Sequence, residues 1–117
     1  MKTDGKIVEV SYMISDFIEG INLLDFLNTC KRQEDPIVRY IFTKVGNTLH
    51  KMHKAGFAHR NFKPESIMVT KDLDFKVTNF DFATSLSGSA GDGFDYLTSG
   101  TYMYMAPEIG GGNLYQG

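Results

Sequence analysis

The chain has 117 residues, of which 42% are hydrophobic and 22% are charged, and it carries a net charge of −2. This composition is typical of a globular protein, and the length allows one small domain or a piece of a larger one. The acidic balance excludes a global basic field that would attract nucleic acid or an anionic membrane. A single cysteine excludes an internal disulfide framework. No apolar run approaches the ~20 residues of a membrane span, and no signal-like stretch follows the first residues. These features predict a cytoplasmic or nuclear protein.

The N-terminal region has a strand-like pattern. Apolar and polar residues alternate from Val8 to Ser15, which predicts a half-buried strand. Asp4-Gly5 before it is typical of a hairpin turn. Residues 16–20 form a connector that ends in a glycine.

Two helices are predicted next. The first is short and amphipathic and covers residues 23–27, and a polar stretch over residues 28–35 follows it. For the second helix, Asp35 is the expected N-cap and Pro36 the first helical residue. Its apolar face has helical spacing and consists of Val38, Ile41, Phe42, Val45, Leu49 and Met52. Gly56 is the expected C-terminal cap, and Gly46 inside the helix predicts close packing against a neighbour.

The second half of the chain is more irregular. Residues 67–69 and 75–77 are predicted strands, joined through a turn at Lys71-Asp72. Residues 84–101 are rich in serine, glycine, threonine and aspartate, which predicts a mobile loop.

Three motifs then occur in one order. The segment His59–Ser66 reads His-Arg-Asn-Phe-Lys-Pro-Glu-Ser, and it resembles the catalytic loop of protein kinases. Asn79-Phe80-Asp81 lies where that family has Asp-Phe-Gly, and Ala106-Pro107-Glu108 matches the end of its activation segment. Because the three motifs are in register over the whole chain, the sequence is identified as a member of the protein kinase family. Lys63 and Gly100-Thr101 are similar to serine/threonine kinases of the calcium/calmodulin-dependent type.

The resemblance implies a partial kinase fold of the α+β class. Residues 1–20 would be the end of the N-lobe and the hinge, beginning with the hairpin. Residues 21–117 would be the first part of the C-lobe, with two helices, the catalytic loop and the activation segment. The Gly-rich lid and the strand lysine that contact phosphates in the family correspond to positions before residue 1.

The resemblance also implies site residues. At the catalytic positions these are Asn61, Lys63 and Thr101; at the ATP-binding positions, Asp16, Ile18, Asn22 and Met68; and at the metal positions, Ser66 and Asn79, with Asp81 as a metal ligand if the register slips by two residues. The cofactors implied for the family are ATP and Mg²⁺.

The departures from the family pattern lie at the positions of the catalytic base and of the metal ligands. Asn61 replaces the aspartate that accepts the proton of the attacking hydroxyl, and an amide cannot take that proton. Asn79 replaces an aspartate and Ser66 an asparagine at the metal positions, although Mg²⁺ prefers carboxylate oxygens. The sequence therefore predicts an inactive, pseudokinase-like domain that binds ATP weakly or not at all.

Two alternatives stay open. The chain could be a fragment of an active serine/threonine kinase in which Asp81 holds the metal. It could instead be a protein-interaction module that uses an exposed strand edge and helix face without a nucleotide. Other proteins are the expected partners, and neither nucleic acid nor a membrane is expected.

Overall fold

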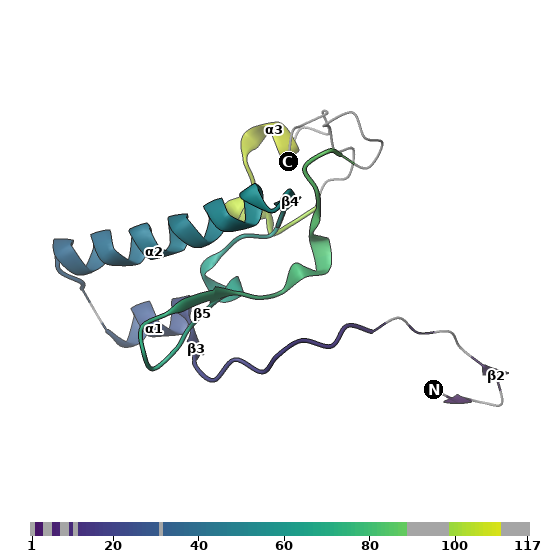
Figure 1. Ribbon diagram of the computed structural model, residues 1–117, viewed down its shortest axis with the longest axis horizontal. Helices are drawn as coiled ribbons and strands as arrows, with labels where there is room; N and C mark the ends of the chain where they lie inside the picture. The colour runs from purple at the N-terminus through teal and green to yellow at the C-terminus, as the bar shows by residue number, and fades with distance from the viewer. Residues whose placement is uncertain are drawn as a thin grey trace.

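The computed structural model describes residues 2–3, 6–7, 10, 12–30, 32–88 and 99–110. Its strands are β1 (Lys2–Thr3), β2 (Lys6–Ile7), β3 (Ile21–Asn22), β4 (Phe57–Ala58), β5 (Ile67–Val69), β6 (Phe75–Val77) and β7 (Thr84–Ser85). Its helices are α1 (Leu23–Thr29), α2 (Asp35–Lys54) and α3 (Pro107–Gly110), with 3₁₀ turns η1 (Pro64–Ser66), η2 (Phe80–Phe82) and η3 (Tyr102–Tyr104). The predicted α+β class is confirmed (Figure 1).

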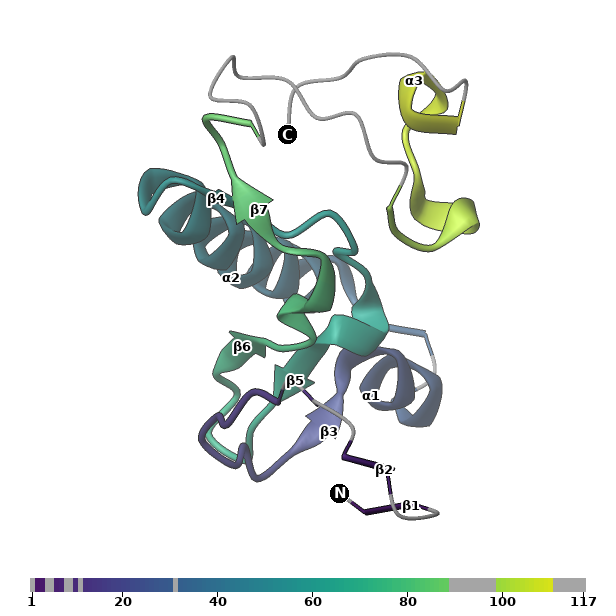
Figure 2. The same cartoon turned by 90° about the vertical axis from the view of Figure 1, so that its right-hand side faces the viewer.

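A three-stranded antiparallel sheet and two helices form the core. The sheet has the order β3-β5-β6, with Ile21 opposite Val69 and Val69 opposite Phe75. Figure 2 shows α1 beside β3 and β5. The buried cluster consists of Leu23, Ile41, Ile67, Val69 and Phe75. In β5, residues 67 and 69 are buried and residue 68 is half-buried, which is the period of two that a strand imposes.

Both helix starts depend on residues just before the first turn. The side chain of Asn22 accepts a hydrogen bond from the Asp25 N–H at 2.8 Å and so caps α1. The prediction that Asp35 caps α2 is wrong, because Glu34 is the N-cap and Asp35 is already helical. The Asp35 carboxylate instead pairs with Arg39 Nε at 2.7 Å, one turn further along.

Glycines at two places in this helical region behave differently. Gly56 follows α2 with a φ of +86°, and its N–H donates to the His53 carbonyl, so the predicted C-terminal cap is confirmed. The predicted close packing at Gly46 is wrong, since among the described residues no atom beyond the adjacent helix backbone and chain neighbours lies within 4 Å of the place a β-carbon would take.

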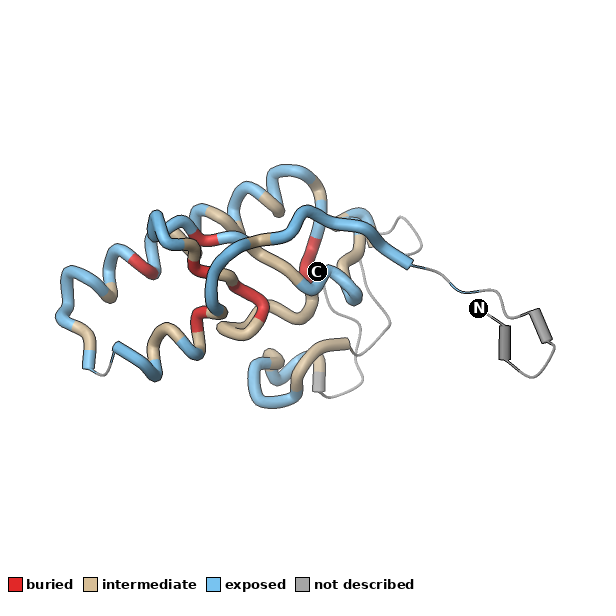
Figure 3. The backbone as a smooth tube through the Cα atoms, turned by 90° about the horizontal axis from the view of Figure 1, so that it is seen from below, coloured by how far each residue is buried: buried red, intermediate tan, exposed pale blue. Residues whose placement is uncertain are grey.

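The N-terminal arm, defined as residues 12–20, extends from β3 as an irregular segment along one side of the molecule (Figures 1 and 3). The predicted half-buried strand is wrong for the described part of residues 8–15: Tyr12 is 83% exposed and Ile14 is 85% exposed. Among the described residues no strand pairs with this segment, so an alternating pattern has no sheet to join. A hairpin is present, but its strands are β1 and β2, so the predicted second strand at residues 8–15 is wrong, and the turn residues Asp4 and Gly5 lie outside the described residues.

The segment after η2 contains a strand that the sequence did not indicate. Thr84–Ser85 forms β7 and pairs with β4, and the Leu86 N–H donates to the Gly56 carbonyl at 2.8 Å. The predicted loop over residues 84–101 is therefore wrong at its start, and residues 89–98 lie outside the described residues. No helix in the described part of the chain is both long and apolar enough to cross a membrane.

Candidate active site

A buried histidine anchors the segment that follows β4. His59 is 2% exposed, and its ring contacts Phe62 and Phe80 with centroids 5.9 and 5.2 Å away. Its Nδ1 accepts the Asn61 N–H at 3.2 Å, so its Nε2 carries the proton and donates to the Thr78 carbonyl at 2.8 Å. The Nε2 bond thus holds the loop against the end of β6, and the Nδ1 bond fixes the backbone within the loop.

The neighbouring arginine makes a second connection to the same region. Arg60 has a φ of 60°, an uncommon conformation for a residue with a β-carbon. Its Nε donates to the Phe82 carbonyl in η2 at 2.5 Å. Together with His59, this bond fixes the loop relative to η2.

Three of the predicted site residues meet at one point. Lys63 Nζ donates to Thr101 Oγ1 at 2.8 Å, and Thr101 Oγ1 donates to Asn61 Oδ1 at 2.9 Å. The single hydroxyl of Thr101 therefore accepts from a cation and donates to an amide. The structure thus brings together the three predicted catalytic positions, although Thr101 lies 38 residues after Lys63 and 40 residues after Asn61.

The backbone on the other side of this contact requires a glycine. Gly100 has a φ of +119°, and a β-carbon there would overlap the Arg60 carbonyl oxygen. This close approach keeps Thr101 beside the loop that carries Asn61 and Lys63.

Ser66 lies apart from solvent at the end of η1. It is 0% exposed, and its hydroxyl donates to the Asn61 carbonyl at 3.1 Å. Its own carbonyl accepts the Thr78 N–H at 2.9 Å. The side chain thus stabilises the loop, and its role as a metal ligand stays a prediction.

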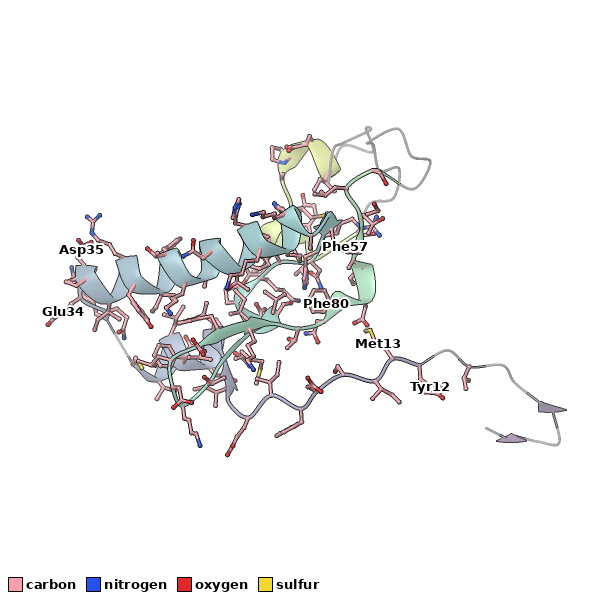
Figure 4. All side chains as sticks on the ribbon, viewed as in Figure 1. Tyr12, Met13, Glu34, Asp35, Phe57 and Phe80 are labelled. Carbon is pink, nitrogen blue, oxygen red and sulfur yellow. The ribbon has the colours of Figure 1, made fainter. Side chains whose placement is uncertain are left out.

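A cleft of about 650 Å³ separates the N-terminal arm from β5, β6 and η2. Figure 4 shows Met13 on the arm and Phe80 in η2 on opposite sides of it. Among the predicted ATP and metal positions, those that line the cleft are Asp16, Ile18, Met68, Asn79 and Asp81. Asn22 and Ser66 do not line it, since the first caps α1 and the second is buried.

The residues present do not fit a kinase magnesium site. Mg²⁺ takes hard oxygen ligands in an octahedral arrangement. Here Asn79 offers an amide oxygen, Asp81 one exposed carboxylate, and Ser66 a hydroxyl already used inside the loop.

Sequence reasoning missed two residues of this region. Thr78 joins the loop to β6 through its carbonyl, its N–H and its hydroxyl, which donates to the Ser66 carbonyl at 3.3 Å. Lys76 brings a cation to the cleft. For Lys76, alternation in β6 was the available signal, because Phe75 faces the core and residue 76 therefore faces the opposite side. The backbone bonds of Thr78 have no such signal.

Comparison with known proteins supports the family that the motifs indicate. The family model described as protein kinase domain matches residues 6–117. The chain is 32% identical over 107 residues to maternal embryonic leucine zipper kinase of Danio rerio, which covers 91% of this chain and 16% of that protein. It is 32% identical over 98 residues to CBL-interacting protein kinase 30 of Oryza sativa subsp. japonica, covering 84% and 21%.

A yeast relative gives a similar match. Serine/threonine-protein kinase cds1 of Schizosaccharomyces pombe is 31% identical over 98 residues, again covering 84% of this chain and 21% of that protein. The chain thus spans about a fifth of the length of the curated relatives it matches. The motifs and the match over nearly all its residues lead to one conclusion: the chain belongs to the protein kinase domain family.

Proposed function

We propose that this chain is part of a kinase domain that has lost phosphoryl transfer and acts as a pseudokinase-like binding module. Residues 1–20 would be the end of the N-lobe with the hinge, and residues 21–117 the first part of the C-lobe. The observation that carries the proposal is the hydrogen-bonded set Lys63–Thr101–Asn61. The three side chains are joined by hydrogen bonds, but Asn61 carries an amide at the position of the family's catalytic base.

The chemistry at Asn61 argues against a transfer reaction. Its Oδ1 accepts a hydrogen bond from Thr101, and its amide nitrogen has no lone pair with which to take a proton. Loss of a positioned base typically lowers a rate by about 10²–10⁴-fold. The amide at position 79 and the buried hydroxyl of Ser66 leave the transferring phosphate without the usual metal support.

The cleft beside the arm supports a remaining nucleotide interaction. Ile18, Met68 and Met13 offer apolar contact to a flat purine ring, and Lys76 offers a cation to a phosphate. We infer that ATP would bind here weakly and without a requirement for Mg²⁺, because the carboxylate ligands of the family pattern are absent.

A phosphoryl-transfer assay tests the proposal. The protein is incubated with γ-labelled ATP, Mg²⁺ and a general protein substrate, beside the Lys63→Ala variant. Equal background incorporation in both supports the proposal. Incorporation that Lys63→Ala abolishes would contradict it.

A second candidate is that the chain is part of an active serine/threonine kinase. Asp81 favours it, since this carboxylate lines the same cleft as Asn79 and could take the metal position. The curated relatives are also named as kinases. This candidate predicts transfer that Asp81→Asn abolishes and that Asn79→Ala leaves in place.

A further inference from the structure

A second groove lies on the side of α2 that faces the turn between β5 and β6. It has a volume of about 270 Å³ and is lined by the side chains of Lys44, Asn47, His50 and Lys51 on α2 and by Asp74 on the turn. None of these residues lines the cleft beside the arm. The groove is thus separate from the candidate active site.

The walls of the groove are held by contacts between α2 and β6. Thr48 Oγ1 lies 2.9 Å from the Lys44 carbonyl and 3.4 Å from the Phe75 carbonyl. The rings of Tyr40 and Phe75 meet edge to face with centroids 6.4 Å apart. These contacts position α2 against β6, so the ordering cost on binding falls mainly on the two lysine side chains.

The turn on the opposite wall is also closed by hydrogen bonds. The Thr70 N–H donates to the Asp74 carbonyl at 3.0 Å, and the Asp74 N–H donates to Thr70 Oγ1 at 3.2 Å. These bonds fix the backbone of Asp74 beside α2.

The charge in the groove is unbalanced. Lys44 Nζ lies 5.4 Å from the centre of the Tyr40 ring and 4.0 Å from Asp74 Oδ1, the outer limit of an ion pair. No ion pair in the described part of the chain involves Lys51. With histidines neutral, α2 has four basic residues against Asp35, a net charge of +3 in a chain of −2. The basic residues in this helix are Arg39, Lys44, Lys51 and Lys54.

We propose that this groove binds an acidic peptide segment of a partner protein. Carboxylates of the peptide pair with Lys44 and Lys51, and the amide of Asn47 bonds to its backbone. Asp74 already offers Lys44 a carboxylate at a long distance, so an incoming carboxylate competes with it. A short peptide fits better than a nucleic acid, because a polyanion needs an extended basic surface and the rest of this chain is acidic.

Fluorescence anisotropy with a labelled octapeptide of glutamate and alanine tests the proposal on the whole chain at low salt, where exposed charges are least screened. Lys44→Gln/Lys51→Gln should weaken binding about tenfold. Asp74→Asn should strengthen it about two- to threefold, since the competing carboxylate is lost. The matched control, Arg39→Gln/Lys54→Gln, removes the same charge from α2 outside the groove and should change binding less than about twofold.

Three results would overturn the proposal. The peptide could fail to bind, both double variants could weaken binding equally, or a single-stranded RNA of equal charge could bind more tightly than the peptide. Circular dichroism checks that each variant is folded. If Lys44→Gln/Lys51→Gln does not fold, the comparison of Asp74→Asn with the unmodified chain decides, and no gain in affinity refutes the proposal.

Discussion

Thr101 donates its hydroxyl hydrogen to the side-chain oxygen of Asn61, a residue 40 positions earlier, at 2.9 Å. Because Lys63 donates to the same hydroxyl, the segment at residues 99–101 is bound to the catalytic-loop motif by two consecutive hydrogen bonds. A carboxylate at position 61 would accept the same hydrogen bond from Thr101. The three side chains are thus joined by hydrogen bonds although position 61 carries an amide.

Removal of this hydroxyl should destabilise the chain. Thr101→Val keeps the shape of the side chain and leaves Lys63 and Asn61, both part-buried, without their shared partner. We expect a loss of about 1–2 kcal/mol in the free energy of unfolding, measured by urea denaturation. The control is Thr43→Val, whose exposed hydroxyl only bonds to the Arg39 carbonyl in its own helix and should cost less than about 0.5 kcal/mol. Equal losses of unfolding free energy in the two variants would show that the Thr101 hydroxyl stabilises the chain no more than an exposed hydroxyl on a helix.

Two glycines should respond in opposite directions to alanine. Gly100→Ala places a β-carbon against the Arg60 carbonyl at a φ of +119° and should cost about 1–3 kcal/mol. Gly46→Ala enters open space in the middle of α2 and should stabilise the chain by about 0.5–1 kcal/mol. Thermal melting of both variants measures the difference. A tolerated alanine at position 100 would mean that the close approach to Arg60 is not maintained in solution.

Ser66 should behave as a structural residue. Ser66→Ala removes the bond to the Asn61 carbonyl in a fully buried place and should cost about 1 kcal/mol of unfolding free energy. Because the hydroxyl does not line the cleft, the effect of ATP and Mg²⁺ on the melting temperature should not change. A loss of a magnesium effect in this variant would instead support the predicted metal role.

A carboxylate at position 79 should create a response to magnesium. Asn79 has a φ of 60° and a ψ of 56°, a left-handed conformation that aspartate also tolerates, so Asn79→Asp should fold normally. We expect ATP to raise the melting temperature of this variant more with Mg²⁺ than with EDTA. The matched test is Asp81→Asn in the unmodified chain. This variant should keep the same melting temperature as the unmodified chain in ATP with Mg²⁺ and in ATP with EDTA. A magnesium effect that Asp81→Asn removes would favour the shifted register.

The sequence predicted the elements whose signals are local. The apolar spacing of α2, the glycine that ends it, the apolar run of β5 and the alternation in β6 each reflect the geometry of one element, and these elements are confirmed. The predicted apolar face of α2 is wrong at Phe42, which is 74% exposed. The N-terminal arm could not be predicted in this way, because alternation of apolar residues shows a strand only where a partner strand exists. The pairing of β4 with β7 is a contact between two-residue strands, too short for any periodicity.

The site was also predictable only in part, because its contacts join segments that are distant in the sequence. The family motifs indicated Asn61, Lys63 and Thr101, but no pattern in the sequence shows that one hydroxyl joins the other two side chains. The bond from His59 to the Thr78 carbonyl is a backbone contact 19 residues away, which side-chain identity does not encode. Gly46 was misjudged because a glycine inside a helix indicates either close packing or an exposed surface.

The most direct test of the central proposal, that the site does not use Mg²⁺, is the melting temperature of the chain in saturating ATP with Mg²⁺ and with EDTA. Ligand at about 100 times its Kd adds about 2.7 kcal/mol to the stability of the state that binds it. We predict the same melting temperature in the two solutions. A magnesium-dependent increase of the size expected from that stabilisation would contradict the claim and would show that a metal site is present.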